Sequence, residues 1–141
     1  MAQGALLSAI VFLAARSRGR TRSPIAVSTG TTLLGLGTGI IAAGAAALGR
    51  NLTPFPKPAD DAVLVREGVF SLMRHPLYTG VMMISVGWAL AWQSAPALMV
   101  ALGSMPFFDA KARREEQWLR EKFPEYRDYQ RSVKRFVPGV Y

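Results

Sequence analysis

Cysteine is absent from the 141-residue chain, and histidine occurs once, at His75. The lack of thiols excludes disulfide bonds, thiolate metal sites and a cysteine nucleophile. The acidic pair Asp60-Asp61 has no further acidic or histidine neighbour nearby, so it indicates a solvated turn, and we expect no metal site. Acidic residues are also few, 9 against 17 lysines and arginines, which gives a formal net charge of +8. No nucleic-acid-binding motif accompanies this charge, so it favours attraction to anionic lipid headgroups.

Charge is missing altogether from three stretches, residues 4–15, 24–49 and 77–108. A helix that crosses a bilayer needs about 20 apolar residues, so residues 24–49 predict one span. The third stretch is too long for one helix, and it is interrupted by the polar and proline-containing residues 93–96, so it predicts a hairpin of two helices. Residues 4–15 are short, which leaves a short span and an interfacial helix as alternatives.

These stretches predict an all-α, multi-span helical membrane protein with about three to four transmembrane helices. We expect a single domain over residues 1–141, in which the N-terminal spans precede a core of about residues 50–141. Alternating prolines at positions 54, 56 and 58 favour an extended connection. The basic cluster of the N-terminal region follows the apolar stretch instead of preceding it, which is not typical of a secretory signal.

The basic residues are distributed unevenly along the chain. Four lie in residues 16–22, four in 50–76 and nine in 109–141. If residues 24–49 cross once and residues 77–108 cross twice, the last two groups share one membrane face and hold thirteen of the seventeen basic residues. The positive-inside tendency places that face in the cytoplasm, so we expect an integral protein of a bacterial-type inner or cell membrane. The compact cluster at 16–22 favours the opposite orientation.

Glycine is frequent in residues 24–49. Gly35 and Gly39 are four residues apart and share a helix face, where small residues let another transmembrane helix approach closely, in the same subunit or in a second one. The sequence GLGTG lacks a preceding strand and a third spaced glycine, so it does not indicate a phosphate-binding loop.

Residues 109–135 are charged and predict a helix that continues the second leg of the hairpin. One stripe of this helix is apolar except for a single glutamate, and consists of Phe108, Ala112, Glu116, Leu119 and Phe123. Spacing alone favours a solvated pair between Glu116 and Arg120 at i,i+4. Pro124 interrupts the helix. A second amphipathic turn follows, with one side formed by Tyr126, Tyr129, Val133 and Phe136.

The sequence RHPLYTG, residues 74–80, lies where the polar connection meets the hairpin. Pro76 suits the first turn of a helix. Arg74, His75 and the unsatisfied N–H groups of that turn would together attract an anion at the membrane surface. An alternative is that Arg74 reaches lipid headgroups and His75 is an interfacial residue.

The acidic pair Glu115-Glu116 returns to the same membrane face one hairpin later. A cationic cluster and an acidic pair then meet at one end of the hairpin, which would suit a zwitterionic ligand. S-adenosyl-L-methionine is such a ligand, because it carries a carboxylate, an ammonium, a ribose diol and a sulfonium.

Six stretches resemble the membrane methyltransferases of the isoprenylcysteine carboxyl methyltransferase and phospholipid methyltransferase type. The resemblance covers about residues 30–141, and the combination of RHPxYxG, a hairpin and then Glu-Glu is its specific part. In the family's order and spacing, the stretches are NLTPFPKP (51–58), LVREGVF (64–70), RHPLYTG (74–80), ARREEQWL (112–119), FPEYRDY (123–129) and VKRFVPGVY (133–141).

The resemblance implies an all-helical membrane fold with a cytosol-facing pocket for S-adenosyl-L-methionine. It implies that the cofactor-binding residues are Gly68, His75, Tyr78, Gly80, Glu115 and Glu116. It further implies that Arg74 and Glu116 orient the cofactor or the acceptor as catalytic residues. Members of the family often have Gly-Pro-Tyr where this chain has Gly-Val-Phe ending at Phe70, so a hydroxyl is lost there. The N-terminal half is also shorter than in the eukaryotic members.

The resemblance therefore implies methyl transfer to a small or lipophilic acceptor, which is a carboxylate, amine, thiol or hydroxyl that reaches the site from among the membrane lipids. Two alternatives stay open, an NADPH-dependent membrane reductase of related fold and a non-enzymatic membrane scaffold. The sequence does not indicate which residue, if any, acts as a base, nor the oligomeric state.

Overall fold

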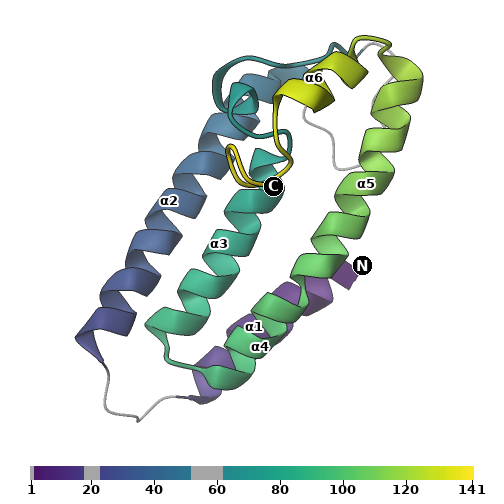
Figure 1. Cartoon of the computed structure of the whole chain (residues 1–141). Coiled ribbons are helices and arrows are strands. Elements are labelled where there is room, and N and C mark those ends of the chain that lie inside the picture. Colours follow the sequence, from purple (N-terminus) through teal and green to yellow (C-terminus); the bar gives the residue numbers. More distant parts are fainter. Residues whose placement is uncertain (1, 18–22, 52–61) are drawn as a thin grey trace. The chain divides into compact units, whose positions relative to one another are not determined.

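The computed structural model describes residues 2–17, 23–51 and 62–141, and within these residues every regular element is a helix (Figure 1). This confirms the predicted all-α fold. The alternating prolines and Asp60-Asp61 lie outside the described residues. In chain order the elements are α1 Ala2–Arg16, α2 Pro24–Leu48, η1 Gly49–Asn51, η2 Gly68–Ser71, α3 Pro76–Ala91, α4 Ala95–Gly103, α5 Met105–Lys122 and α6 Tyr126–Ser132.

Among the described residues, α2 is the helix that is long and apolar enough to cross a membrane. It has 25 residues, whereas the apolar helices α1 and α3 have 15 and 16. At about 1.5 Å per residue, α3 is shorter than the ~30 Å hydrocarbon core of a bilayer. The span of residues 24–49 therefore has its predicted helix, while the total of three to four spans stays a prediction.

The predicted hairpin of residues 77–108 turns where its polar residues lie. The first leg, α3, ends at Ala91 and the second begins at Ala95. Gln93 adopts a left-handed backbone with φ 50°, and the Ser94 hydroxyl accepts a hydrogen bond from the N–H of Ala97. Ser94 thus caps α4, because its side chain satisfies an N–H that has no partner inside the helix.

The second leg differs from the prediction of one helix running into residues 109–135. α4 ends at Gly103 and α5 starts at Met105, so the helix is interrupted at Ser104. Pro106 explains the break, because proline has no N–H to donate to the carbonyl four residues earlier and its ring crowds that carbonyl. The predicted stop at Pro124 is confirmed, since α5 ends at Lys122.

The helices form two compact units, and each unit contains two separate stretches of the chain. Unit 1 contains Met1–Gly39 and Gly80–Phe107, and unit 2 contains Ile40–Thr79 and Phe108–Tyr141.

Unit 1 is held together by small residues. α1 packs against α4, and the buried cluster there consists of Ile10, Ala14, Ala89, Ala97 and Ala101. α2 approaches α3 at Gly30 and Gly37, where a Cβ at Gly37 would lie 2.7 Å from the carbonyl oxygen of Gly80. A Cβ at Gly35 or Gly39 would meet nothing within 4 Å. The pair that the sequence predicted as a packing face is therefore not at the contact between α2 and α3, which uses the glycines seven residues apart.

Unit 2 contains the buried aromatic residues Phe70, Tyr126, Tyr129 and Phe136. Both amphipathic faces predicted for residues 108–136 are directed inward. On α5, Phe108, Ala112 and Glu116 are each 1% exposed or less. The Tyr129 hydroxyl donates a 2.5 Å hydrogen bond to the carbonyl oxygen of Phe70, which ties α6 to η2. Unit 2 therefore buries Glu116, together with His75 and Thr79, among aromatic side chains.

Candidate functional site

The segment before α3 pairs with the chain that follows α6. Met73 and Lys134 form an isolated parallel bridge, and the N–H groups of Arg74 and His75 donate to the carbonyl oxygens of Lys134 and Arg135 at 2.9 and 3.0 Å. The main chain of residues 134–135 therefore occupies the N–H groups of Arg74 and His75, which are not available to a ligand. The N–H groups that the sequence predicts to attract an anion are those of the first turn of α3, and that prediction stays open.

Glu116 lies at the centre of the site and is 1% exposed. Its Oε1 accepts hydrogen bonds from Arg74 Nε at 3.0 Å and from Arg135 Nε at 3.1 Å, and it lies 3.1 Å from His75 Nε2. Its Oε2 accepts from Gln130 Nε2 and Arg135 Nη2, both at 3.0 Å. Both carboxylate oxygens are therefore fully used by partners from four other positions in unit 2.

The expected solvated pair between Glu116 and Arg120 is wrong. Glu116 faces the interior, and Arg120 donates to Gln130 Oε1 at 3.3 Å instead. Helical spacing places the two residues on one face of α5, but the guanidinium groups of Arg74 and Arg135 bind the Glu116 carboxylate. Arg74 Nη2 lies 2.9 Å from Glu116 Oε1, with the side chains 7% and 1% exposed. A buried carboxylate needs such paired charges, because water does not solvate it.

Opposing effects act on the acidity of Glu116. Burial raises its pKa, but the hydrogen bonds from His75 and Arg135 and the positive charge of Arg74 outweigh burial and hold the pKa well below its usual value. Glu116 is therefore ionised at neutral pH. The pKa of Arg135 is raised by its hydrogen bonds to Glu116 and Asp109, so the guanidinium keeps its charge.

Arg74 is committed to the fold as well as to Glu116. Its Nη1 donates to the carbonyl oxygens of Gln130 and Val133, at the C-terminal end of α6. A guanidinium has five N–H donors in a rigid fork, and most of those of Arg74 are used by Glu116 and these two carbonyls. Arg74 thus joins α5 to the end of α6.

Glu115 differs from its neighbour in both exposure and partners. Its side chain is 27% exposed. Its Oε2 accepts a 2.8 Å hydrogen bond from the Tyr78 hydroxyl and lies 3.8 Å from His75 Nδ1. The rings of His75 and Tyr78 stack with centroids 5.4 Å apart and planes 6° apart, and Lys111 Nζ lies over the Tyr78 ring. Among the described residues no side chain holds the second oxygen of Glu115, so this carboxylate can accept from a ligand.

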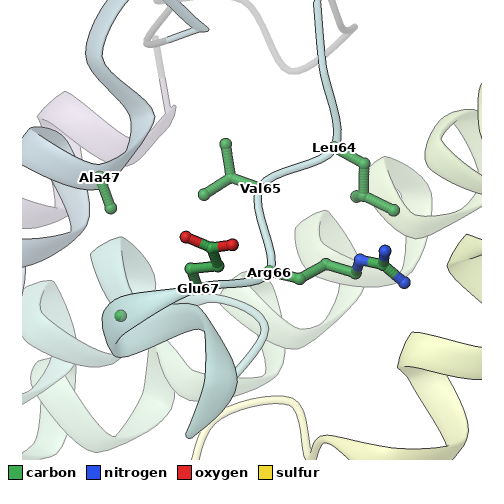
Figure 2. Close-up of a pocket in the computed structure, with 6 residues that line it drawn as sticks. Ala47, Leu64, Val65, Arg66 and Glu67 are labelled. Carbon is green, nitrogen blue, oxygen red and sulfur yellow. The ribbon is translucent and has the colours of Figure 1, made fainter.

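Gly68 lines a pocket of 440 Å³ that is shown in Figure 2. The pocket is lined by Ala47 and by residues 64–68. Val65 and Glu67 point toward the side of Ala47, and Leu64 and Arg66 extend the other way, as in an extended segment (Figure 2). Gly68 has φ +60°, a conformation that favours glycine. Its immediate role is therefore to turn the chain into η2.

Gly80 lies at a helix contact, and Phe70 is buried. Gly80 lies at the approach of α2 to α3, opposite Gly37. Phe70 is 7% exposed, so the ring that replaces the tyrosine frequent in the family lies in the interior of unit 2. Of the predicted site residues, the structure thus brings together Arg74, His75, Tyr78, Glu115 and Glu116, while Gly68 lines the pocket of Figure 2 and Gly80 lies against Gly37.

Three residues of the site were not predicted. Arg135 and Gln130 donate to Glu116, and Asp109 accepts from Arg135 Nη1 at 2.6 Å. The sequence held one signal for Arg135, which is its place in the stretch VKRFVPGVY. Gln130 and Asp109 carried none, because their role depends on how α5 and α6 pack.

The described residues thus form an all-helical fold that has an apolar helix of membrane-spanning length and a charge-paired interior. The sequence profile of the phospholipid methyltransferase family matches residues 25–126. The chain belongs to this family.

Individual relatives agree with this family. A protein-S-isoprenylcysteine O-methyltransferase of Dictyostelium discoideum is 35% identical over 85 residues, which cover 58% of this chain and 35% of that protein. The cobalt-zinc-cadmium resistance protein CzcN of Cupriavidus metallidurans is 33% identical over 78 residues, 55% of this chain and 36% of that protein. The chain thus spans little more than a third of the length of these curated relatives.

A solved structure shares the fold. The eukaryotic intramembrane Ras methyltransferase, isoprenylcysteine carboxyl methyltransferase, matches with a TM-score of 0.74 and 27% sequence identity. The match covers 81% of this chain and 42% of that structure. The family resemblance suggested by the six sequence stretches is therefore confirmed.

Proposed function

We propose that this chain is a membrane methyltransferase that takes its methyl group from S-adenosyl-L-methionine and transfers it to a small or lipophilic acceptor. Membership of the phospholipid methyltransferase family supports the class of reaction. The observation that carries the proposal is the partly exposed carboxylate of Glu115, which lies beside His75 and Tyr78 and has one oxygen without a partner among the described residues.

The residues of unit 2 fit this cofactor chemically. An ammonium or a ribose hydroxyl needs an acceptor, and Glu115 Oε1, which has no partner among the described residues, is one. The stacked rings of His75 and Tyr78 lie beside this carboxylate. Tyr78 also fixes the orientation of Glu115 through its 2.8 Å hydrogen bond, so the acceptor oxygen is held in place before a ligand arrives.

The two glutamates then have different roles. Glu115 contacts the cofactor, together with His75 and Tyr78. Glu116 and Arg74 are positioning residues, because both carboxylate oxygens of Glu116 and most donors of Arg74 are used within the protein. Through its Oε1, Glu116 fixes the imidazole of His75 at 3.1 Å. Gly68 and Gly80 act through the backbone, the first by its turn into η2 and the second by admitting α2.

The chemistry places modest demands on the protein. When bound, S-adenosyl-L-methionine supplies a methyl group that the sulfonium already activates. The protein has to align donor and acceptor and to exclude water. A carboxylate acceptor would need no base, whereas an amine acceptor would have to be neutral, so the charge of the acceptor decides whether a proton must be removed.

The membrane location belongs to the same proposal. α2 has the length and composition of a membrane span, and thirteen of the seventeen basic residues lie in residues 50–141. By the positive-inside tendency the site and the C-terminal part face the cytoplasm. A lipophilic acceptor would then arrive from the bilayer, while the cofactor enters from water.

Calorimetric titration of the detergent-purified protein with S-adenosyl-L-methionine and with NADPH tests this proposal. We expect Glu115→Gln to weaken binding of S-adenosyl-L-methionine by about tenfold or more, or about 1.4 kcal/mol, because an anionic acceptor becomes a neutral amide. Glu121→Gln, an exposed residue of the same helix, serves as the matched control and should bind like the wild type.

The two titrations separate the alternatives. A folded wild type that does not bind S-adenosyl-L-methionine would refute the proposal. Binding of NADPH alone would then support a reductase, and binding of neither would support a scaffold. If S-adenosyl-L-methionine binds, transfer of its labelled methyl group to carboxylate, amine, thiol and hydroxyl acceptors of graded lipophilicity would identify the acceptor class.

A further inference from the structure

A second carboxylate lies two helical turns before Glu116 on α5. Asp109 precedes Glu116 by seven residues, which places both on one face of the helix. Its Oδ1 accepts from Arg135 Nη1 at 2.6 Å and from the Tyr141 hydroxyl at 3.0 Å. Its Oδ2 accepts from Arg113 Nε at 2.7 Å. None of these contacts involves the sequence RHPLYTG or Glu115.

Arg135 connects the two carboxylates. Its Nε and Nη2 bind Glu116, and its Nη1 binds Asp109. The guanidinium is planar and its donors have fixed directions, so two acceptors on one helix face determine where it lies. The Arg135 side chain is 13% exposed, and few water molecules compete for its donors. The position of Arg135 against Glu116 therefore depends on Asp109.

Tyr141 extends this arrangement to the C-terminal turn. The N–H groups of Phe136 and Val137 both donate to the main-chain oxygen of Tyr141 at 2.7 Å, and the N–H of Tyr141 donates back to Val137. The Arg135 guanidinium lies over the Tyr141 ring, 5.7 Å from its centroid. The ring of Phe136 contacts both Tyr141 and His75, with centroids 6.2 and 6.0 Å apart. The turn thus connects Asp109 with the imidazole of the candidate site.

We propose that Asp109 and Tyr141 are positioning residues that hold Arg135 against Glu116 and the Phe136 ring against His75. This inference rests on the proposed function, because the geometry being positioned is that of the cofactor site. If Asp109 loses its charge, Arg135 keeps its bonds to Glu116, but its third nitrogen loses its charged acceptor and has only neutral ones, such as the Tyr141 hydroxyl at 3.4 Å. Glu116, which contacts both Arg135 and His75, is then held less firmly against His75, and the cofactor binds more weakly.

A double-mutant cycle measured by calorimetry tests the link through Arg135. The variants are Asp109→Asn, Arg135→Gln and both together, titrated with S-adenosyl-L-methionine. We expect Asp109→Asn to weaken binding about tenfold in the wild type and less than twofold in the Arg135→Gln background, because residues that act through one another are not additive. Additive losses, or unchanged affinity in Asp109→Asn, would overturn the proposal. Asp128→Asn is the control, because its 79% exposed carboxylate pairs only with the exposed Arg131 among the described residues.

Amide hydrogen exchange of the unliganded protein gives a readout that needs no cofactor. Tyr141→Phe removes one hydroxyl from a half-exposed ring and should preserve the fold. We expect exchange at Phe136 and Val137 to rise about three- to tenfold in Tyr141→Phe and in Asp109→Asn, relative to Val133, whose N–H donates to Tyr129. Unchanged exchange in both variants would contradict the proposed positioning. If exchange responds but the wild type binds no cofactor, the positioning of Arg135 stands and the proposed function fails.

Discussion

Unit 1 and unit 2 use opposite kinds of interior. The buried side chains of unit 1 are mainly alanines and serines, and its helices α2 and α3 meet through glycines. All nine acidic residues lie in the stretches of unit 2, which buries Glu116 against two arginines and a histidine. Close contact of small residues is a way to join helices where lipid surrounds them. A buried ionic cluster costs desolvation and holds donors in fixed directions, and unit 2 is the unit to which we assign the proposed cofactor site.

Removal of the Glu116 carboxylate should be the most destabilising of the proposed substitutions. A small loss would contradict the contrast drawn between the two interiors. Glu116→Ala leaves Arg74 and Arg135 buried without their common partner, and we expect a loss of about 3–5 kcal/mol in the free energy of unfolding. Unfolding in mixed detergent micelles, followed by circular dichroism, measures this loss. Glu121→Ala on the exposed side of α5 should lose less than about 1 kcal/mol. Similar small losses in both variants would mean that the cluster does not stabilise unit 2.

The corresponding change in unit 1 is the addition of one methyl group. A Cβ at Gly37 would lie 2.7 Å from the Gly80 carbonyl oxygen and 2.9 Å from Ile84 Cγ1. Backbone atoms cannot move aside cheaply, so we expect Gly37→Ala to destabilise the protein by about 1–3 kcal/mol. Gly35→Ala on the same helix is the control, because a Cβ there meets nothing within 4 Å. It should be neutral or slightly stabilising, since alanine favours helix. Equal effects of the two changes in the same unfolding measurement would contradict the assigned contact.

This pair of glycines shows how far the sequence predicted unit 1. It predicted α2 and the turn of the hairpin, because the length of an apolar run and the positions of proline and polar residues are local properties. It did not predict that Gly30 and Gly37, and not Gly35 and Gly39, meet α3. A helix rich in glycine offers several small faces, and the partner helix selects one of them.

The candidate site shows a similar limit. The resemblance located His75, Tyr78 and the two glutamates, which the structure brings together. Local spacing, however, paired Glu116 with Arg120, since a helix alone offers only neighbours three and four residues away. Glu116 is instead bound by residues 19 and 42 positions away in the chain, Arg135 and Arg74. Only the packing of α5 against α6 and the start of α3 determines those partners.

The pH dependence of the free energy of unfolding tests whether the ionised Glu116 stabilises unit 2. Glu116 has a folded pKa below its usual value of 4.5, so its contribution is fully present above pH 4.5 and is lost as the pH falls below that value. We expect a loss of about 1–2 kcal/mol between pH 6 and pH 3 that is attributable to Glu116. The free energy of unfolding, measured over this range for wild type and Glu116→Gln, should show a shallower slope in the variant. Glu121→Gln should keep the wild-type slope, and equal slopes in all three proteins would contradict the buried pairing.

Two tyrosines of α6 differ in whether their buried hydroxyl groups have a hydrogen-bond partner. The Tyr129 hydroxyl donates a hydrogen bond to the buried carbonyl oxygen of Phe70. The Tyr126 hydroxyl is also buried but has no hydrogen-bond partner among the described residues. Burial raises the pKa of Tyr129 to about 12, so its proton stays in place at neutral pH. Both side chains contribute nearly the same apolar area, and the comparison therefore isolates the hydrogen bond.

Tyr129→Phe should cost about 1 kcal/mol in the free energy of unfolding, because it leaves the Phe70 carbonyl without its donor. Tyr126→Phe should be neutral or slightly stabilising, because it removes a buried hydroxyl that gains nothing from burial. The two single variants can be compared in one series of unfolding curves. A larger loss in Tyr126→Phe than in Tyr129→Phe would show that the Tyr126 hydroxyl binds a group beyond the described residues. The interior of unit 2 would then contain a polar contact in addition to the Glu116 cluster.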